Sequence, residues 1–273
     1  FYKKIDIQNK LISFGSLYLR SLKVLHIKGD DQKIKDFLQG QVSSDISELS
    51  DLSSQLSCIC NQKGLVMAGF LIQKVNKNFK IIIEESLIET FVEDLMPYAK
   101  FFGVTFHLGD ESIQGHVIES IKKPKNKNSF LSNGRFDLEV EIIENKKSIS
   151  NEISLAKWQI INKLALNHSL CFDDIALYRP LELNYDKLRV SFTKGCFRGQ
   201  EIIARMHYLG VNRRSFCAVI ENTDHPLENN IKPLGKKLEY ENYKIYNCFI
   251  EQDIQNELIK SNKHELFSML TNQ

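Results

Sequence analysis

The alternation of strand and helix patterns between Leu56 and Leu108 restricts the fold of this chain more than any other feature. Residues 65–75 and 79–85 have the pattern of two strands, and the polar residues 76–78 predict a turn between them. An amphipathic helix and a further strand follow directly in the sequence. Helices that cover one face of an antiparallel sheet form a layered structure, so we expect a fold of the α+β class.

The helix in this segment has signals at both of its ends. Ser86 and, three residues later, Glu89 form a capping-box pattern that predicts the helix start, and Gly103 predicts its end. Its apolar residues share one stripe, made up of Ile88, Phe91, Val92, Leu95, Ala99 and Phe102. An earlier and shorter helix follows Gly29 and is expected to end at Gly40.

The second half of the chain has weaker signals. Asn133-Gly134 predicts a hairpin between two strands, and residues 152–167 around Trp158 have helical spacing. Residues 171–197 form a long segment without a regular pattern, and the aromatic residues in it argue that it is ordered. After Arg214, strand patterns predict a small β-rich unit that could not be very stable alone.

Composition argues against several classes of protein. The formal charge is +2 at pH 7, which argues against a dedicated nucleic-acid-binding protein. No apolar run approaches the roughly 20 residues that cross a bilayer, and the N-terminal residues lack the apolar stretch of a secretory signal. The 6 cysteines include no C-x-x-C pair and no zinc spacing, so we expect reduced thiols, no metal site and a cytoplasmic location.

Residues 193–210, TKGCFRGQEIIARMHYLG, carry most of the functional signal. Gly195 and Gly199 allow tight turns and the close approach of a ligand to the backbone. Helical spacing begins just after them, and the free N–H groups at a helix start favour an anion or a thiolate. We therefore predict that Cys196 is a reactive thiol. The alternative is a structural turn that holds a buried, inert cysteine.

The same stretch has a local excess of positive charge. Between Lys194 and Arg214, the basic residues outnumber Glu201, which is the one acidic residue there. Such a patch suits a phosphate or another polyanionic ligand, and the alternative is a solvated face without a ligand. Lys194 and Arg198 also favour the thiolate form of the nearby cysteine.

Residues 194–201, KGCFRGQE, resemble the K-G-C-Y/F-x-G-Q-E signature of the YgfZ-type folate-binding family. Members of that family are described as tRNA-modification and iron–sulfur cluster assembly proteins. Four further stretches resemble segments of the family: FLQGQVSSDI (37–46), NQKGLV (61–66), RPLELNYD (179–186) and IIARMHYLGVNRR (202–214). The resemblance runs from about Leu17 to Arg214 and fades beyond it.

The resemblance also implies a fold, because the family shares its architecture with the glycine-cleavage T-protein, a tetrahydrofolate-dependent aminomethyltransferase. It implies ferredoxin-like halves around a central cavity, followed by a small C-terminal β domain. We expect a folate-binding α+β region over residues 1–212, made of two intertwined subdomains, roughly 25–110 and the remainder. Residues 213–273 would form a short C-terminal β-rich domain, truncated relative to the family's usual barrel.

Site residues and a cofactor follow from the same resemblance. Cys196 is the reactive or cluster-facing thiol, and the cofactor is tetrahydrofolate or a related reduced folate. The residues expected to bind it are Lys194, Gly195, Phe197, Arg198, Gly199, Gln200, Glu201, Gln41 and Arg205. Among these, Lys194 and Arg198 would supply positive charge, while Gln200 and Glu201 would order the site.

Two departures from related sequences bear on activity. Aligning Asn61–Gly64 with the N-x-x-G turn of the T-protein places Ala68 and Gly69 where that enzyme has its catalytic acid. Proton transfer in one-carbon chemistry needs a positioned acid or base, so we expect a binding protein rather than an enzyme. Asn162 stands where related sequences often have an arginine that could pair with a ligand carboxylate.

The resemblance favours a folate-binding protein that supports iron–sulfur cluster assembly or repair and, through it, tRNA modification. Its expected partners are a small-molecule folate and iron–sulfur assembly or client proteins, with no membrane partner. A tetrahydrofolate-dependent, aminomethyltransferase-like one-carbon enzyme is the first alternative. The second is direct tRNA binding, which a steep salt dependence would favour, through Arg205, Arg213, Arg214 and the lysine-rich loop at 122–128.

Overall fold

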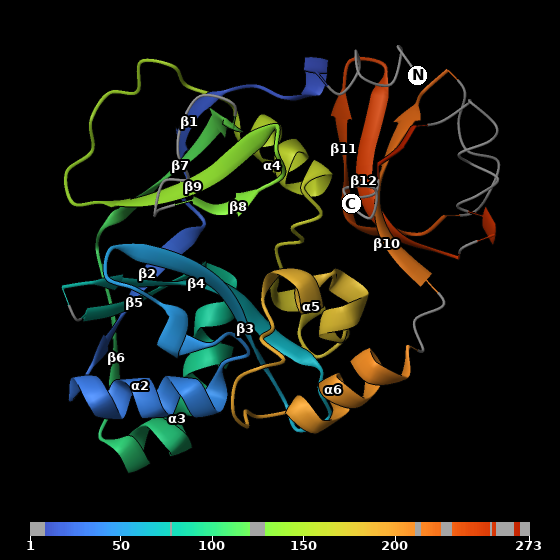
Figure 1. The fold of residues 1–273 in the computed structure, drawn as a ribbon. Coiled ribbons are helices and arrows are strands. Elements are labelled where there is room, and N and C mark those ends of the chain that lie inside the picture. The colour runs from blue at the N-terminus through green and yellow to red at the C-terminus, as the bar shows by residue number, and fades with distance from the viewer. Residues whose placement is uncertain are drawn as a thin grey trace.

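The computed structural model describes residues 9–76, 78–120, 129–210, 214–224, 231–251, 253–254 and 265–267. Within these ranges the strands form three sheets, and helices cover one face of the largest sheet (Figure 1). The architecture is α+β, as the sequence predicts. In the described part of the chain, no helix combines the length and the apolar character needed to cross a membrane.

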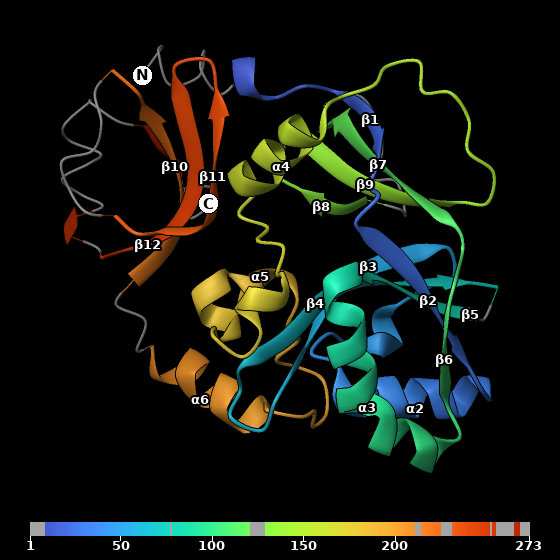
Figure 2. The same ribbon diagram turned by 180° about the vertical axis from the view of Figure 1, so that it is seen from behind.

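The first sheet consists of antiparallel strands in the order β3-β4-β5-β2-β6. Its strands are β2 (Leu22–Lys28), β3 (Ser53–Cys60), β4 (Val66–Val75), β5 (Asn78–Glu84) and β6 (Thr105–Leu108). The helices on one face are α2 (Asp31–Gln41) and α3 (Ile88–Phe102), with the short turns η1 (Ile46–Glu48) and η2 (Glu85–Leu87) beside them (Figure 2). Phe37 and Phe91 of these helices lie in the larger hydrophobic core.

The helix ends in this layer confirm one signal and contradict two. Gly103 ends α3 in the left-handed conformation with φ 66°. The capping box at Ser86 is wrong, because this residue lies in the 3₁₀ turn η2 and α3 begins at Ile88 without a side-chain cap. The predicted end at Gly40 is early, since α2 continues past it until Val42 closes the helix in an extended conformation.

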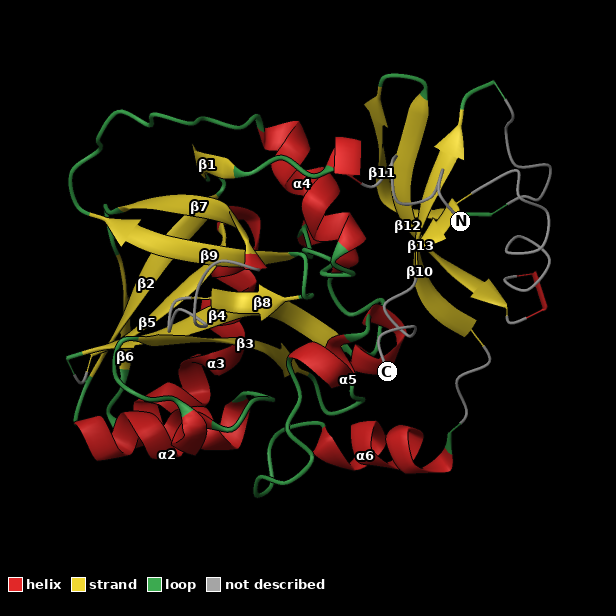
Figure 3. Cartoon of the chain, turned by 45° about the horizontal axis from the view of Figure 1, so that its top comes forward, coloured by secondary structure: helices red, strands yellow, loops and turns green. Residues whose placement is uncertain are grey.

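The second sheet has the order β1-β7-β9-β8 and lies across the other face of the first sheet (Figure 3). Its elements are β1 (Gly15–Tyr18), β7 (Ser112–Glu119), β8 (Ser129–Ser132) and β9 (Phe136–Ile143), together with the helix α4 (Leu155–Leu164). Val24 and Ile82 of the first sheet share a core with Val117 and Trp158. The hairpin predicted at Asn133-Gly134 joins β8 to β9, with Gly134 at φ 81°.

The chain after α4 is ordered, as predicted, and forms short helices before it enters the third sheet. These are η4 (Phe172–Asp174), η5 (Pro180–Leu183), α5 (Tyr185–Leu188) and α6 (Gln200–Leu209). The third sheet, in the order β11-β12-β10-β13, consists of β10 (Arg214–Asn222), β11 (Pro233–Tyr240), β12 (Tyr243–Glu251) and β13 (Glu265–Phe267). Ile160 and Leu164 of α4 share a core with Ile220 and Ile245 of this sheet. The domain division expected at residues 212–213 stays a prediction.

Candidate functional site

The signature residues surround the start of α6, where the sequence spacing predicts a helix. Gly199 forms the turn before the helix in the left-handed conformation, with φ 83°. A Cβ at this position would lie 2.6 Å from the carbonyl oxygen of Asn61, so only glycine fits. Gly195 has no neighbouring atom within 4 Å of where a Cβ would be, and nothing in the structure explains glycine there.

Segments far apart in the sequence pack around this turn. The backbone N–H of Arg198 donates to the carbonyl oxygen of Gly40 at 3.2 Å, so the signature lies against the end of α2. Ile202 of α6 lies so close to Gly64 that a Cβ there would come within 3.1 Å of it. The structure therefore brings the signature together with three of the four further stretches that carry the resemblance.

Cys196 is exposed on this turn. The neighbouring Phe197 is buried, and its backbone N–H donates to Oε1 of Gln200 at 3.3 Å. These contacts hold the backbone that follows the thiol without covering it. The alternative of a buried Cys196 is therefore wrong, and the reactivity of this thiol stays a prediction.

The charge of Lys194 is directed into the protein. Its side chain is buried, and Nζ donates to the carbonyl oxygens of Val42 at 2.8 Å and Ser44 at 2.9 Å. Burial lowers the pKa of Lys194 to about 8, while the Asp45 carboxylate acts in the opposite direction. This geometry corrects the expectation that Lys194 presents charge to a ligand, since its ammonium group instead ties the signature to the segment after α2.

Arg198 is also engaged within the protein. Its guanidinium pairs with Asp94 of α3 and lies 5.6 Å from the ring centre of Tyr98. Because the carboxylate neutralises the guanidinium, the expectation that Arg198 supplies free positive charge is corrected too. The binding roles expected for the remaining side chains stay predictions, with Gln41 buried at the end of α2 and Glu201 and Arg205 exposed along α6.

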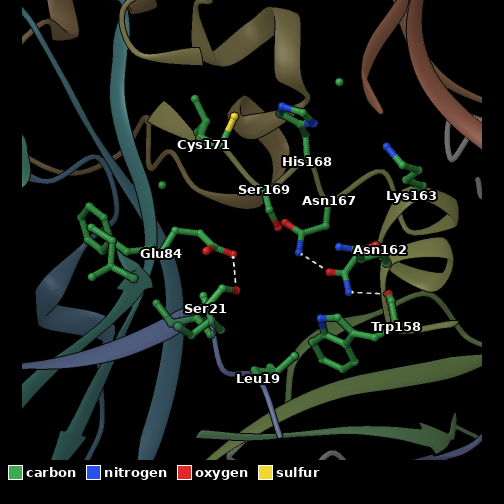
Figure 4. Close-up of a pocket in the computed structure, with 18 of the residues that line it drawn as sticks. Leu19, Ser21, Glu84, Trp158, Asn162, Lys163, Asn167, His168, Ser169 and Cys171 are labelled. Carbon is green, nitrogen blue, oxygen red and sulfur yellow. Dashed lines mark hydrogen bonds between the residues drawn. The ribbon is translucent and has the colours of Figure 1, made fainter. Parts of the chain in front are cut away.

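A cavity of about 510 Å³ lies between the first two sheets, α4 and the third sheet (Figure 4). Much of its wall is apolar and includes Leu19, Leu71, Ile82 and Trp158. None of residues 194–201 lines this cavity, and neither does Gln41 or Arg205. The structure thus brings the predicted site residues together at the start of α6, apart from the cavity wall.

A polar network runs along the cavity wall beside Trp158. Nδ2 of Asn162 donates to the carbonyl oxygen of Trp158 at 2.9 Å, and Nδ2 of Asn167 donates to Oδ1 of Asn162 at 2.8 Å (Figure 4). Arg189 continues the network, since its Nη2 donates to Oδ1 of Asn167 at 2.8 Å. The cavity wall therefore has an amide at position 162, where related sequences often have an arginine. The guanidinium group in this wall belongs to Arg189, which lies just after α5.

Carboxylates line the cavity at two other places. The hydroxyl of Ser21 donates to Glu84 at 3.1 Å across the cavity from the asparagines, and burial raises the pKa of Glu84 (Figure 4). Asp174 lies 3.3 Å from Nε2 of His168 and accepts from the thiol of Cys171 at 3.4 Å. Burial raises the pKa of Cys171, and the negative charge of Asp174 raises it further.

The positions aligned with the T-protein acid are tightly packed. A Cβ at Gly69 would come within 2.9 Å of Oη of Tyr185 and 3.1 Å of Cδ1 of Leu170, and Ala68 is completely buried. An aspartate at position 69 would therefore displace Tyr185. Among the described residues, no group of His, Cys, Asp and Glu side chains is arranged to hold a metal ion.

Comparison with known proteins adds independent information. A search against models of protein families gives no match. An uncharacterized protein from Haemophilus influenzae is 28% identical over 208 residues, covering 72% of this chain and 70% of that protein. The tRNA-modifying protein YgfZ of Vibrio atlanticus is 28% identical over 229 residues, and that of Aliivibrio fischeri is 27% identical over 226 residues. These two matches cover 75% of this chain and 69% and 70% of the relatives. By sequence, the chain is similar to YgfZ-type proteins.

A solved structure supports the fold of the chain. The glycine cleavage system aminomethyltransferase T from Bartonella henselae matches with a TM-score of 0.57 and 11% identity. The match covers 91% of this chain and 81% of that chain. The chain therefore has the T-protein-like α+β fold that the resemblance implied.

Several residues that line the cavity were not predicted as site residues. Glu84 and Asn167 have no sequence signal of their own, because each lies at the end of an ordinary element. Arg189 carried one signal, since it stands between Leu188 and Val190 in a segment that was expected to be ordered. An arginine between apolar neighbours in an ordered segment often has a buried partner.

Proposed function

We propose that this YgfZ-type chain binds a reduced folate in its cavity and, through Cys196, supports iron–sulfur cluster assembly or repair in the cytoplasm. The cavity is the observation that carries the proposal, because its volume of about 510 Å³ and its apolar wall with a few inward polar groups suit a small ligand. The names of the relatives support a link to tRNA modification. We attribute that link to cluster-dependent modifying enzymes that this protein would serve.

The lining residues fit the parts of a reduced folate. The indole of Trp158 and the side chains of Leu71 and Ile82 offer apolar surface to a heterocyclic ring. Glu84 offers a carboxyl group to the N–H groups of such a ring, and Arg189 offers a cation to its oxygen atoms. A reduced folate bound there would supply ring nitrogen atoms that can carry a one-carbon unit.

The exposed thiol of Cys196 is the basis for the second half of the proposal. The thiol lies on a turn that is fixed by Gly199 and by the buried Lys194, so its position is defined although it faces solvent. Thiolates are preferred ligands of iron–sulfur clusters. We therefore expect iron–sulfur assembly or client proteins to contact this face.

The two alternatives have less support. Aminomethyl transfer lacks a carboxylate at Ala68 and Gly69, where the packing leaves no room for one. For direct tRNA binding, Arg205 is exposed but Arg214 lies 3.8 Å from Glu251. The remaining residues of that hypothesis, Arg213 and the lysine-rich loop at 122–128, lie outside the described residues.

Fluorescence tests the folate part of the proposal directly. The sequence has a single tryptophan, Trp158, and this residue lines the cavity. Anaerobic titration with tetrahydrofolate is therefore expected to change the emission in a saturable way. An emission that stays constant up to millimolar tetrahydrofolate, with no binding heat in calorimetry, would contradict a folate site.

Complementation tests the part played by Cys196. In a cell that lacks the native protein, Cys196→Ala is expected not to restore the activity of cluster-dependent enzymes. Thr193→Ala, a substitution at an exposed residue of the same segment, is the matched control and should restore it. Full rescue by Cys196→Ala would reduce the thiol to a surface residue without a role.

A further inference from the structure

Arg189 is a buried cation in the cavity wall that has only neutral partners among the described residues. Its exposed fraction is 5%, and it lines the cavity. Nη1 donates to the carbonyl oxygens of Ser57 and Phe70, both at 3.1 Å, and Nη2 donates to Oδ1 of Asn167 at 2.8 Å. The guanidinium carbon lies 4.3 Å from the ring centre of Tyr185.

The positive charge of Arg189 is not balanced by the rest of the cavity wall. Neutral dipoles solvate a buried cation incompletely, and a buried charge without a counter-ion is costly. The two carboxylates of the wall are engaged elsewhere, since Glu84 accepts from Ser21 and Asp174 faces His168. An oxygen atom with negative charge would therefore be stabilised beside Arg189.

Two buried polar atoms of the wall also lack a hydrogen-bond partner. Nε of Arg189 has no acceptor, although the side chain is more than nine-tenths buried. Oδ1 of Asn247, in β12, has no donor, while its Nδ2 donates to the carbonyl oxygen of Lys163 at 3.0 Å. Because buried polar groups are nearly always paired, the cavity presents an open donor and an open acceptor to a ligand.

We propose that Arg189 anchors the ligand of this cavity by binding an oxygen atom that carries full or partial negative charge. The inference rests on the cavity part of the proposed function and names the chemistry that the cavity selects. A reduced folate has such oxygen atoms in two places, the oxo group of its pterin ring and the carboxylates of its glutamate tail. Neutral ligands without such an oxygen are expected to bind poorly.

The test uses a variant that neutralises Arg189 and leaves it in place. Replacing Arg189 itself is a poor test, because Nη1 links the backbones of β3 and β4 and its loss would disturb the fold. Asn167→Asp keeps the shape of the side chain and places a carboxylate next to Nη2. Asn145→Asp is the matched control, since it makes the same change at an exposed residue outside the cavity lining.

Calorimetric titrations of the full chain use three probes, namely tetrahydrofolate, 6-methyltetrahydropterin and p-aminobenzoylglutamate. A carboxylate at position 167 gains the charge of Arg189 but loses the hydrogen bond from Nδ2 to Asn162. We therefore expect Asn167→Asp to keep the fold and to bind tetrahydrofolate roughly tenfold or more weakly. Asn145→Asp is expected to stay within about threefold of wild type, because surface charges are well screened. Weaker binding of the pterin alone assigns Arg189 to the ring oxygen, and weaker binding of p-aminobenzoylglutamate alone assigns it to the tail.

The outcomes separate this inference from the proposed function. Unchanged affinity in Asn167→Asp, or an equal loss in Asn145→Asp, would overturn the role of Arg189 while the folate site stands. A wild-type protein that binds none of the three probes would overturn the folate site and the inference together.

Discussion

At Gly199, backbone conformation and packing both require glycine. Its φ of 83° lies in the left-handed region, and an added Cβ would lie 2.6 Å from a carbonyl oxygen. We expect Gly199→Ala to lower the free energy of unfolding by about 1–3 kcal/mol. Gly195→Ala is the control, because the space around it is open, and its effect should stay below about 1 kcal/mol. Urea unfolding of both variants measures the difference, and equal losses would contradict the account.

Cys171 is the exposed thiol whose reactivity the structure lowers. Burial and the charge of Asp174 raise its pKa, so the thiolate that reacts with alkylating agents is scarce at pH 8. In a Cys196→Ser background, Asp174→Asn should lower this pKa and speed alkylation of Cys171 by iodoacetamide several-fold. Asp173→Asn should have a smaller effect, since Asp173 contributes less to the shift. Mass spectrometry of the labelled peptide gives both rates, and equal rates in all three proteins would refute the effect of Asp174.

How well each residue could be predicted from the sequence depends on how local its role is. The requirement for glycine at position 199 follows from a turn before a helix, which neighbouring residues reveal. The role of Arg189 depends on carbonyl oxygens of Ser57 and Phe70, which are 132 and 119 residues away in the sequence. The internal contacts of Lys194 and Arg198 likewise involve distant partners, so the local sequence pattern favours a ligand as the partner of both charges.

At the scale of elements, the segment from α5 to α6 connects the cavity wall to the signature turn. It is held halfway by Ser43, whose Oγ donates to the carbonyl oxygen of Arg189 at 2.7 Å. The backbone N–H of Ser191 donates to the carbonyl oxygen of Ser43, and three residues later the ammonium group of Lys194 fixes the start of the signature. A ligand beside Arg189 and a partner at Cys196 would thus act on one continuous segment.

The buried ammonium group of Lys194 predicts a pH dependence of stability. Its pKa is about 8 in the folded protein and near 10.5 in the unfolded chain, so the unfolded chain binds the extra proton between these values. The free energy of unfolding of the wild type, minus that of Lys194→Met, should therefore increase by about 1–3 kcal/mol between pH 8 and pH 10.5. Lys63→Met, at an exposed lysine, is the control and should show no such trend. Urea unfolding at three pH values measures this difference. A difference between wild type and Lys194→Met that does not change with pH would contradict the burial of a charged lysine.

Periodic patterns predicted the regular elements but not the short helices. The strands and helices of the first sheet follow from side-chain spacing within each element. The turns η4, η5 and α5 depend on contacts that spacing does not show. The backbone N–H of Val66 in β4, for example, donates to the carbonyl oxygen of Tyr178 between η4 and η5 at 2.8 Å. For the same reason the sequence could identify the signature but not the residues that line the cavity, which come from several distant elements.

At the scale of the whole molecule, a ligand in the cavity would contact all three sheets. Asn162 of α4 and Asn247 of β12 both line it, so the ligand should hold the third sheet against the rest of the protein. Tetrahydrofolate at a hundred times its dissociation constant is expected to stabilise the fold by about 2.7 kcal/mol. Hydrogen exchange should slow in α4 and β12 and stay unchanged at the exposed surface of α2. If the ligand slowed hydrogen exchange in α2 as much as in β12, the result would contradict binding in this cavity.

The central claim is that the cavity between the sheets is the ligand site, and a blocking substitution at its wall tests this claim most directly. Ser21 lines the cavity and is exposed, so Ser21→Trp should fill the cavity entrance without disturbing the core. Ser148→Trp, at an exposed loop residue outside the lining, is the matched control. In calorimetric titration with tetrahydrofolate, we predict that Ser21→Trp binds at least about tenfold more weakly than wild type, while Ser148→Trp binds as wild type does. Binding of tetrahydrofolate by Ser21→Trp with wild-type affinity would contradict the account.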